Sequence, residues 1–354
     1  MTDPNTENDY YGPQAYRSDQ IPTVTRKVND LARPWFNRKF DMKLPWGGAE
    51  NVVPSVLRQR YTPEELRKSE ANPTPFGDVK SHQQIDQERY CHSTAALRTR
   101  LLVLLSFFGH PYLMATLAPP TLIAFLFHWY HTPSNTSFLA TTWNFIPVAA
   151  MFYSPLLACW AIPTLLLKYF PNFWIKPFKG PKWELNRRTG LVTQFIYDKK
   201  GHWGQTGKPE ERVAPFYEFD AYLTNEMIPP GQVVHTLYIA HRHEDILLPI
   251  GNLIGKTSGP ECFALWDMFQ NFMDTGRPLP DIPLWEEFRP LDPVSAEHDR
   301  ATGRPARYWR DMDDDTWKQK NEEFGYRVLK LNTITRPNQM RRKVKYERRS
   351  RRTA

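Results

Sequence analysis

The pattern of apolar and polar positions sets one long segment apart from the rest of the chain. No Asp, Glu, Lys or Arg occurs between Leu101 and Leu167, and the polar stretch His131–Ser137 divides this segment into two apolar runs. A helix that crosses the hydrocarbon core of a bilayer needs about 20 apolar residues. Core helices of soluble proteins seldom run so long without a polar face. The pattern therefore predicts a transmembrane hairpin over residues 101–168, with spans at about 112–130 and 138–167.

The flanks of this segment indicate its orientation. Arg98 and Arg100 precede the first run, Lys168 and Lys176 follow the second, and the connecting stretch is uncharged. Basic residues stay on the cytoplasmic side of a membrane. We therefore expect a multi-pass membrane protein with two spans and both termini in the cytoplasm.

The residues before the apolar segment are mostly polar. Residues 1–80 predict a largely disordered cytosolic arm, apart from a short helix started by Thr62 and Pro63. Residues 81–100 are rich in Gln, Glu and Arg and lead directly into the apolar zone. This stretch predicts a juxtamembrane helix.

After Pro177 the apolar pattern changes to a period of two, which indicates strands. Residues 183–197 predict a hairpin, and further strands are expected at 216–223, 233–240 and 246–250. A helix is expected at 258–274, capped by Ser258, with Asp267 and Gln270 on an outward polar face. Residues 182–276 thus predict a mostly antiparallel β domain closed by one helix, so the fold class is an α+β membrane protein. The pattern resembles the pleckstrin-homology-like barrel, and a generic α+β domain is the alternative.

The next segment, residues 277–312, is rich in proline and is expected to wrap along the surface of the domain. Its motifs lie at 278–283, 288–293, 298–300, 302–305 and 307–310. With these motifs the chain resembles an uncharacterised family of proteobacterial two-pass membrane proteins that carry a C-terminal domain of unknown function. Members are often encoded near type VI secretion and toxin loci, so the resemblance implies a toxin or a secretion component as a protein partner.

Aromatic and basic side chains of this segment are the candidates for contact with such a partner. They are Trp285, Phe288, Arg304, Arg307, Tyr308, Trp309 and Arg310.

Residues 313–354 predict a short helix, opened by the acidic run 313–315, and then a basic tail. The net charge of the chain is +8, and near an anionic bilayer each basic residue of such a tail contributes about 1 kcal/mol. The tail is therefore expected at a membrane surface, and nucleic acid is a weaker alternative because no recognition fold accompanies it. The tail residues are Arg341, Arg342, Lys343, Lys345, Arg348, Arg349, Arg351 and Arg352.

Candidate chemistry is sparse. Cys91, Cys159 and Cys262 lie in three different segments without metal-ligand spacing. His241 and His243 could hold a metal from one face of a strand, but a polar turn is the simpler interpretation. No phosphate-binding loop or nucleophile motif occurs, so we expect neither a cofactor nor an enzyme.

Together with the resemblance, the sequence predicts a membrane-anchored, non-catalytic interaction protein of a bacterial inner membrane. The resemblance implies a toxin or type VI secretion context, with an immunity or accessory role. An anionic-lipid-binding membrane module is the first alternative. An oligomeric channel or transporter component is the second, and it would require the chain to form a homo-oligomer.

Overall fold

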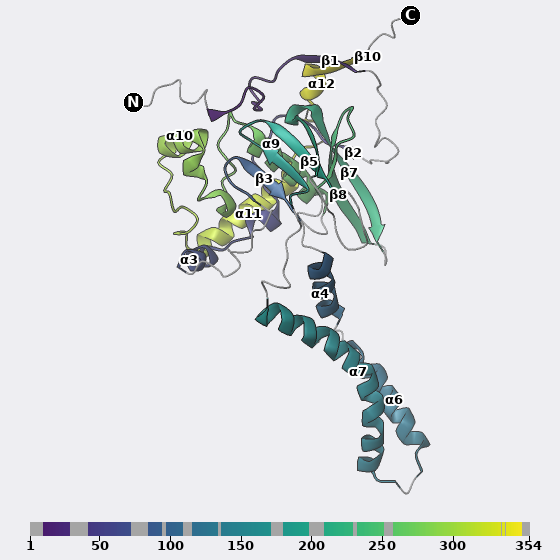
Figure 1. Ribbon diagram of the computed structural model, residues 1–354. Coiled ribbons are helices and arrows are strands. Elements are labelled where there is room, and N and C mark those ends of the chain that lie inside the picture. Colours follow the sequence, from purple (N-terminus) through teal and green to yellow (C-terminus); the bar gives the residue numbers. More distant parts are fainter. Residues whose placement is uncertain are drawn as a thin grey trace, which may run out of the picture. The chain divides into compact units, whose positions relative to one another are not determined.

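The structure is a computed structural model, and its chain divides into two compact units (Figure 1). It describes residues 10–28, 42–71, 84–93, 97–108, 115–133, 136–170, 180–197, 209–228, 232–250, 258–333, 335–336 and 338–348. Unit 1 takes in 1–77, 83–92 and 181–354, and unit 2 takes in 78–82 and 93–180. Unit 2 is therefore an insertion into unit 1.

Two antiparallel sheets of four strands form the frame of unit 1. The first has the order β3-β4-β5-β6 and the second the order β2-β7-β8-β9. The strands of the first sheet are β3 (Arg89–His92), β4 (Trp183–Asn186), β5 (Leu191–Ile196) and β6 (Glu210–Pro215). Those of the second are β2 (Met42–Lys43), β7 (Phe219–Ile228), β8 (Gln232–His241) and β9 (Leu247–Pro249). A separate parallel pair joins β1 (Val24–Val28) to β10 (Val344–Arg348).

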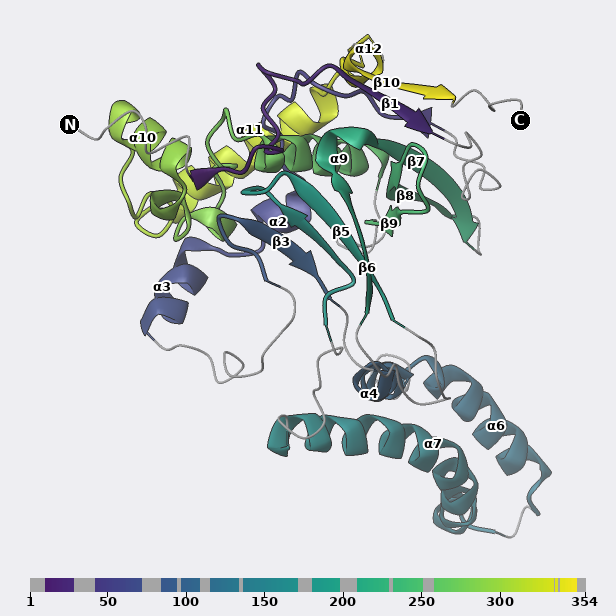
Figure 2. The same ribbon diagram turned by 45° about the horizontal axis from the view of Figure 1, so that its top comes forward.

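The helices of unit 1 are mostly short. They are α2 (Ser55–Arg58), α3 (Pro63–Ala71), α9 (Gly259–Met273), α10 (Pro293–Thr302), α11 (Asp314–Lys330) and α12 (Met340–Lys343). The described residues also form the 3₁₀ turns η2 (Phe216–Glu218), η4 (Pro283–Trp285) and η5 (Arg289–Leu291). Figure 2 shows α9 lying along the sheets, with α11 beside it.

Helix α9 is the centre of the core. Phe269 makes edge-to-face contacts with Tyr90 and Trp183 of the first sheet, at 5.3 and 6.2 Å between ring centroids. Trp266, on the same helix, contacts Trp46 and Phe216. Aromatic contacts of this kind add to the large area that each ring buries, so α9 ties the two sheets into one core.

The polar face of α9 was expected to point outward, and the structure buries it instead. Both carboxylate oxygens of Asp267 accept hydrogen bonds from the backbone N–H of Glu50, at 3.1 and 3.0 Å, and one also accepts from that of Val52, at 3.0 Å. Arg336 forms an ion pair with the same carboxylate at 2.9 Å. The polar residues of this face are therefore satisfied by chain segments that pack over them.

Part of the N-terminal region, predicted as a disordered arm, belongs to this core. Trp46 is fully buried, and its indole N–H donates to the carbonyl of Phe219 at 2.6 Å. Tyr16, Leu44 and Val53 are buried in the same cluster. The arm prediction is wrong for residues 10–28 and 42–71, because isolated apolar side chains in a polar sequence gave no periodic signal.

The juxtamembrane helix predicted at 81–100 is also wrong over its described first part. Asp86 accepts hydrogen bonds from the backbone N–H groups of Glu88 and Arg89, at 2.8 and 2.7 Å, which forms a turn. Strand β3 follows and pairs with β4 in the register His92 with Trp183. The side chain of Tyr90 in β3 is buried. Strand pairing and burial therefore outweigh the helix-favouring composition of residues 81–100.

The proline-rich segment 277–312 differs from a surface wrap. It contains η4, η5 and α10, and the side chains of Leu279, Ile282 and Trp285 are completely buried. Each of these helices has a proline in its first two positions. The N–H that proline lacks has no intrahelical partner there, so the prolines begin helices here.

Unit 2 contains the helices α4 (Leu97–Phe108), α6 (Ala118–His131) and α7 (Phe138–Tyr169). It lies in the connection between β3 and β4, and at its base the Ser93 hydroxyl donates to the carbonyl of Gly180 at 3.0 Å. The expected span at about 112–130 is only partly matched by α6, and residues 109–114 lie outside the described residues.

The transmembrane hairpin is contradicted. Within the described ranges, not one helix by itself has the length and apolar character needed to cross a membrane. Helix α6 has 14 residues, about 21 Å at 1.5 Å per residue, against about 30 Å of hydrocarbon. Helix α7 contains Pro147, Pro155 and Pro163. Its two pieces, Phe138–Met151 and Tyr153–Tyr169, are bent by 50° relative to each other. Only the two pieces taken together are long and apolar enough for a membrane span.

The fold class is therefore α+β with several antiparallel sheets, without the predicted hairpin of spans. The run of uncharged residues correctly indicated apolar helices. The number of apolar residues in the run did not show where prolines would bend or shorten these helices.

Candidate interaction surfaces

The predicted contact residues of segment 277–312 fall into two groups. Trp285 belongs to the core, where its ring stacks on Phe272 at 5.5 Å, and its indole N–H donates to the carbonyl of Asp86 at 3.3 Å. Phe288 is partly buried and packs against the same core. Neither ring is therefore offered to a partner. The other five residues come together around Asp281 and Glu286, beside α3.

Asp281 organises one half of this cluster. Arg304 donates to both carboxylate oxygens of Asp281, at 3.1 and 2.7 Å, and the indole N–H of Trp309 donates to one of them at 2.9 Å. The Tyr308 ring lies under two cations, with Arg304 at 4.9 Å and Lys320 at 5.4 Å from its centroid. A two-pronged guanidinium–carboxylate pair fixes orientation as well as charge, so Arg304 and Trp309 hold each other in place.

Glu286 organises the other half. It accepts hydrogen bonds from the backbone N–H groups of Trp309 and Arg310, at 2.5 and 3.4 Å. Burial raises the pKa of Glu286, against the opposing effect of these N–H groups and of the Arg310 charge. Arg310 also pairs with Glu287, so both glutamates hold the 307–310 turn.

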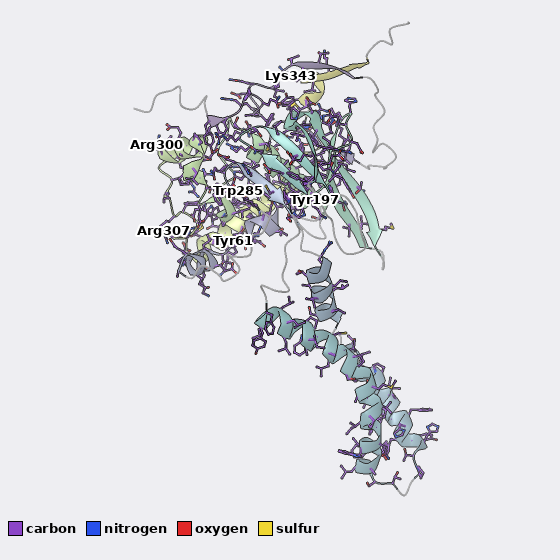
Figure 3. The ribbon with its side chains drawn as sticks, viewed as in Figure 1. Tyr61, Tyr197, Trp285, Arg300, Arg307 and Lys343 are labelled. Carbon is purple, nitrogen blue, oxygen red and sulfur yellow. The ribbon has the colours of Figure 1, made fainter. Side chains whose placement is uncertain are left out.

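Arg307 is the most accessible member of the cluster. Its side chain remains 44% exposed and pairs with Glu70 of α3 at 2.7 Å and with Asp311 at 3.2 Å. Figure 3 places Arg307 and Arg300 at the rim of unit 1 and Trp285 inside it. Arg304, Arg307 and Arg310 all form ion pairs with acidic residues of the chain itself. The cluster therefore connects α3 to the segment after α9.

Of the two candidate histidines, His241 has a structural role. His241 is buried, and its Nδ1 accepts hydrogen bonds from the backbone N–H groups of His243 and Glu244, at 3.2 and 2.8 Å. Its Nε2 therefore carries the proton and donates to Glu218 at 3.0 Å. The described residues contain no group of three His, Cys, Asp or Glu that could hold a metal ion. His241 thus uses both ring nitrogens to fix a turn.

The basic tail is only partly described. Lys343 ends α12 and Lys345 lies in β10, and both side chains are exposed. Arg348 is described through its backbone alone, as the last residue of β10, and the side chains of Arg341 and Arg342 are not described. Arg349, Arg351 and Arg352 lie outside the described residues.

Among the described residues, most of the exposed large apolar side chains belong to unit 2. Ile123, Phe127 and Leu139 are examples, with exposed fractions of 67%, 66% and 78%. Further exposed side chains are Leu101, Val103, Leu104, Leu105, Leu122, Leu126, Trp129, Tyr130, Phe138, Trp143, Ile146, Val148, Met151, Leu157, Ile162, Leu165, Tyr169 and Phe170. Monomeric soluble proteins rarely expose contiguous apolar patches beyond a few hundred Å², so this surface calls for an apolar partner.

Sequence reasoning did not identify the acidic residues that hold the candidate cluster. Asp281 and Glu286 lie among prolines and apolar residues of segment 277–312, and Glu70 lies more than 200 residues earlier in the chain. Their partners are backbone N–H groups and arginines brought together by the fold, and no local motif announces such contacts.

Comparison with known proteins finds no match to this chain among family models, curated proteins or solved structures.

Proposed function

We propose that this chain is a non-catalytic interaction protein that attaches to a lipid bilayer through the apolar helices of unit 2. The observation that carries the proposal is the exposure of the large apolar side chains of α4, α6 and α7. Moving one such side chain from water into an apolar medium contributes about 1.5–3 kcal/mol. Many of them together provide a strong drive toward a partner.

The distribution of these side chains around the helices favours a bilayer over a single protein partner. No residue of α6 is buried. The exposed Leu122, Ile123 and Phe127 are spread over about 140° around the helix axis, because successive residues turn by about 100°. A protein docked against one part of this broad face would leave the rest in water, whereas lipid contacts all of it at once.

Aromatic residues at the helix ends support the same partner. Trp129 and Tyr130 lie in the last turn of α6, and Tyr169 is the last residue of α7. Trp and Tyr are enriched where hydrocarbon meets headgroups, because their rings combine an apolar body with a polar group. The proposal concerns attachment to the bilayer and assigns no spanning segment.

Flotation of the full chain with vesicles tests the attachment. A double variant, Leu122→Lys with Phe127→Lys on α6, is expected to lose most of its flotation, because two charges enter the apolar surface. The matched control is Tyr326→Lys with Leu329→Lys on α11 of unit 1, where both side chains are also exposed. Equal flotation of both double variants would contradict the assignment to unit 2.

The partner of unit 1 is proposed from the family resemblance of segment 277–312. That resemblance favours a bacterial inner membrane as the bilayer and a toxin or type VI secretion component as the bound protein, in an immunity or accessory role. The test is a pull-down of the product of a neighbouring toxin gene by the detergent-solubilised chain, with a toxicity-rescue assay in cells. Neither binding nor rescue would refute this part, while the flotation result would stand.

A further inference from the structure

A small apolar slot lies between α6 and α7 within unit 2. It has a volume of about 240 Å³. It is lined by Leu117, the residue before α6, by Pro120, Thr121 and Ala124 of α6, and by Phe145, Val148, Ala149 and Tyr153 of α7. The alanines at 124 and 149 carry only a methyl group, which leaves space that larger neighbours would fill. The slot is nearly free of polar groups.

One hydroxyl pair interrupts the apolar lining. The Thr121 hydroxyl donates to the carbonyl of Leu117 at 2.6 Å, and its oxygen lies 2.9 Å from the Tyr153 hydroxyl. A hydroxyl has one hydrogen, and that of Thr121 is already used. Tyr153 is therefore the donor in the pair, and the lone pairs of its oxygen can accept a hydrogen bond from another molecule.

We infer that this slot binds a single-chain amphiphile whose head donates a hydrogen bond, such as a long-chain alcohol or a protonated fatty acid. The alkyl chain lies against the aliphatic and aromatic lining, and the head donates to the Tyr153 oxygen. Apolar pockets with few polar groups are the common form of small-molecule sites, in which the polar groups fix orientation.

The surroundings of the slot favour such a ligand over a peptide. The outer faces of both helices are apolar and exposed around the slot, including Leu122 and Ile146, so a molecule arrives there from an apolar medium. A peptide backbone would bring N–H and C=O groups that the lining cannot satisfy. The inference rests on the proposed bilayer attachment, because the bilayer supplies the amphiphile.

The experiment uses a long-chain alcohol with a photoactivatable diazirine in its chain. The full protein is reconstituted in vesicles, illuminated, and digested to map the labelled residues. Ala149→Phe places a ring in the slot and is expected to reduce saturable labelling of residues 117–153 about tenfold. Ala150→Phe adds the same ring at the neighbouring exposed position, which does not line the slot, and should leave labelling unchanged.

A second arm tests the hydrogen bond. Unlabelled long-chain alcohol should compete better than its methyl ether, which has no donor, and Tyr153→Phe should abolish that difference. A phosphatidylcholine with the same diazirine chain reports contact with bulk lipid, and its labelling should be equal in both alanine variants.

Equal labelling of Ala149→Phe and Ala150→Phe by the alcohol would overturn the slot. Equal competition by alcohol and ether in the unmodified protein would overturn the hydrogen bond. Flotation of the same preparations measures the bilayer attachment separately. A protein that floats but shows no saturable labelling would refute the ligand site between α6 and α7 and would leave the bilayer attachment standing.

Discussion

Arg187 shows how a single residue joins distant parts of unit 1. Its side chain is fully buried and forms an ion pair with Asp292, also fully buried, at 3.0 Å. The same guanidinium donates to the carbonyls of Phe272, Asp274 and Arg277, at 2.6, 2.9 and 2.6 Å. These carbonyls lie at and beyond the end of α9, where helix carbonyls lack partners within the helix. Arg187 therefore closes α9 and connects it to the β4–β5 turn.

We predict that Asp292→Ala destabilises the protein strongly. Removing this carboxylate leaves the Arg187 charge buried without an ion-pair partner, which costs about 3–5 kcal/mol. Denaturant unfolding measures the change. The control Glu297→Ala removes an exposed partner of Arg300 and is expected to change the free energy of unfolding by no more than about 0.5 kcal/mol. A similar small effect for Asp292→Ala would contradict the structural role of the pair.

His92 makes stability depend on pH. Burial, together with the nearby Lys182 charge, lowers the pKa of His92 from 6.5 to about 4 in the folded protein. The unfolded chain takes up a proton as pH falls through about 6.5, while the folded chain does so only near pH 4. The unfolded state therefore binds more protons in this window, and stability is lost as pH falls across it.

His92→Phe isolates this contribution, because phenylalanine retains a ring that can stack on Trp183, where the histidine ring lies at 5.3 Å. We expect the free energy of unfolding of the unmodified protein, relative to that of the variant, to fall between about pH 6.5 and pH 4. Unfolding curves across this range measure the difference. A constant difference would show that His92 titrates alike in both states.

At the scale of elements, some sequence signals agreed closely with the structure. The helix expected at 258–274 is α9, Gly259–Met273, and the strands expected at 183–197 form the β4–β5 hairpin. The acidic run before α11 supplies its cap, since Asp313 accepts a hydrogen bond from the N–H of Thr316 at 2.8 Å. These elements carry strong local periodicity, a turn or a cap, which sequence reveals.

Strands that pair with segments far away in the sequence were not predicted. Strand β3 is four residues long and gains its stability from pairing with β4, across the whole of unit 2. Strand β1 pairs with β10, at the opposite end of the chain. The candidate cluster around Asp281 and Glu286 has the same origin, because its ion pairs join segments far apart in sequence. No short window contains the information for such contacts.

The N-terminal segment is predicted to be essential for the fold of unit 1. Trp46→Ala should destabilise the protein by about 3–5 kcal/mol, because a large buried ring leaves a cavity among Trp266, Phe216 and Tyr16. The control Val56→Ala shortens an exposed side chain and should change the free energy of unfolding by no more than about 0.5 kcal/mol. Near-neutral behaviour of Trp46→Ala in denaturant unfolding would restore the interpretation of this region as a loose arm.

At the scale of the whole molecule, the chain combines two units of opposite character. Unit 1 gathers most of its buried apolar side chains in one core, whereas unit 2 exposes the apolar side chains of α4, α6 and α7. The sequence identified the apolar segment, but it did not reveal that the segment is an insertion between two neighbouring strands. Because two chain connections join the units, a partner bound to unit 2 is tethered to unit 1 by both of them.

Attachment through the apolar side chains of unit 2 does not need charged lipid, whereas attachment through the basic tail would. Flotation with neutral phosphatidylcholine vesicles and with anionic vesicles, at salt from about 0.1 M to about 1 M, distinguishes the two. Over this range the Debye length falls from about 10 Å to about 3 Å, which screens electrostatic attraction but leaves apolar burial. We predict flotation with neutral vesicles that salt does not reduce. Flotation only with anionic vesicles, lost at high salt, or no flotation at all, would contradict it.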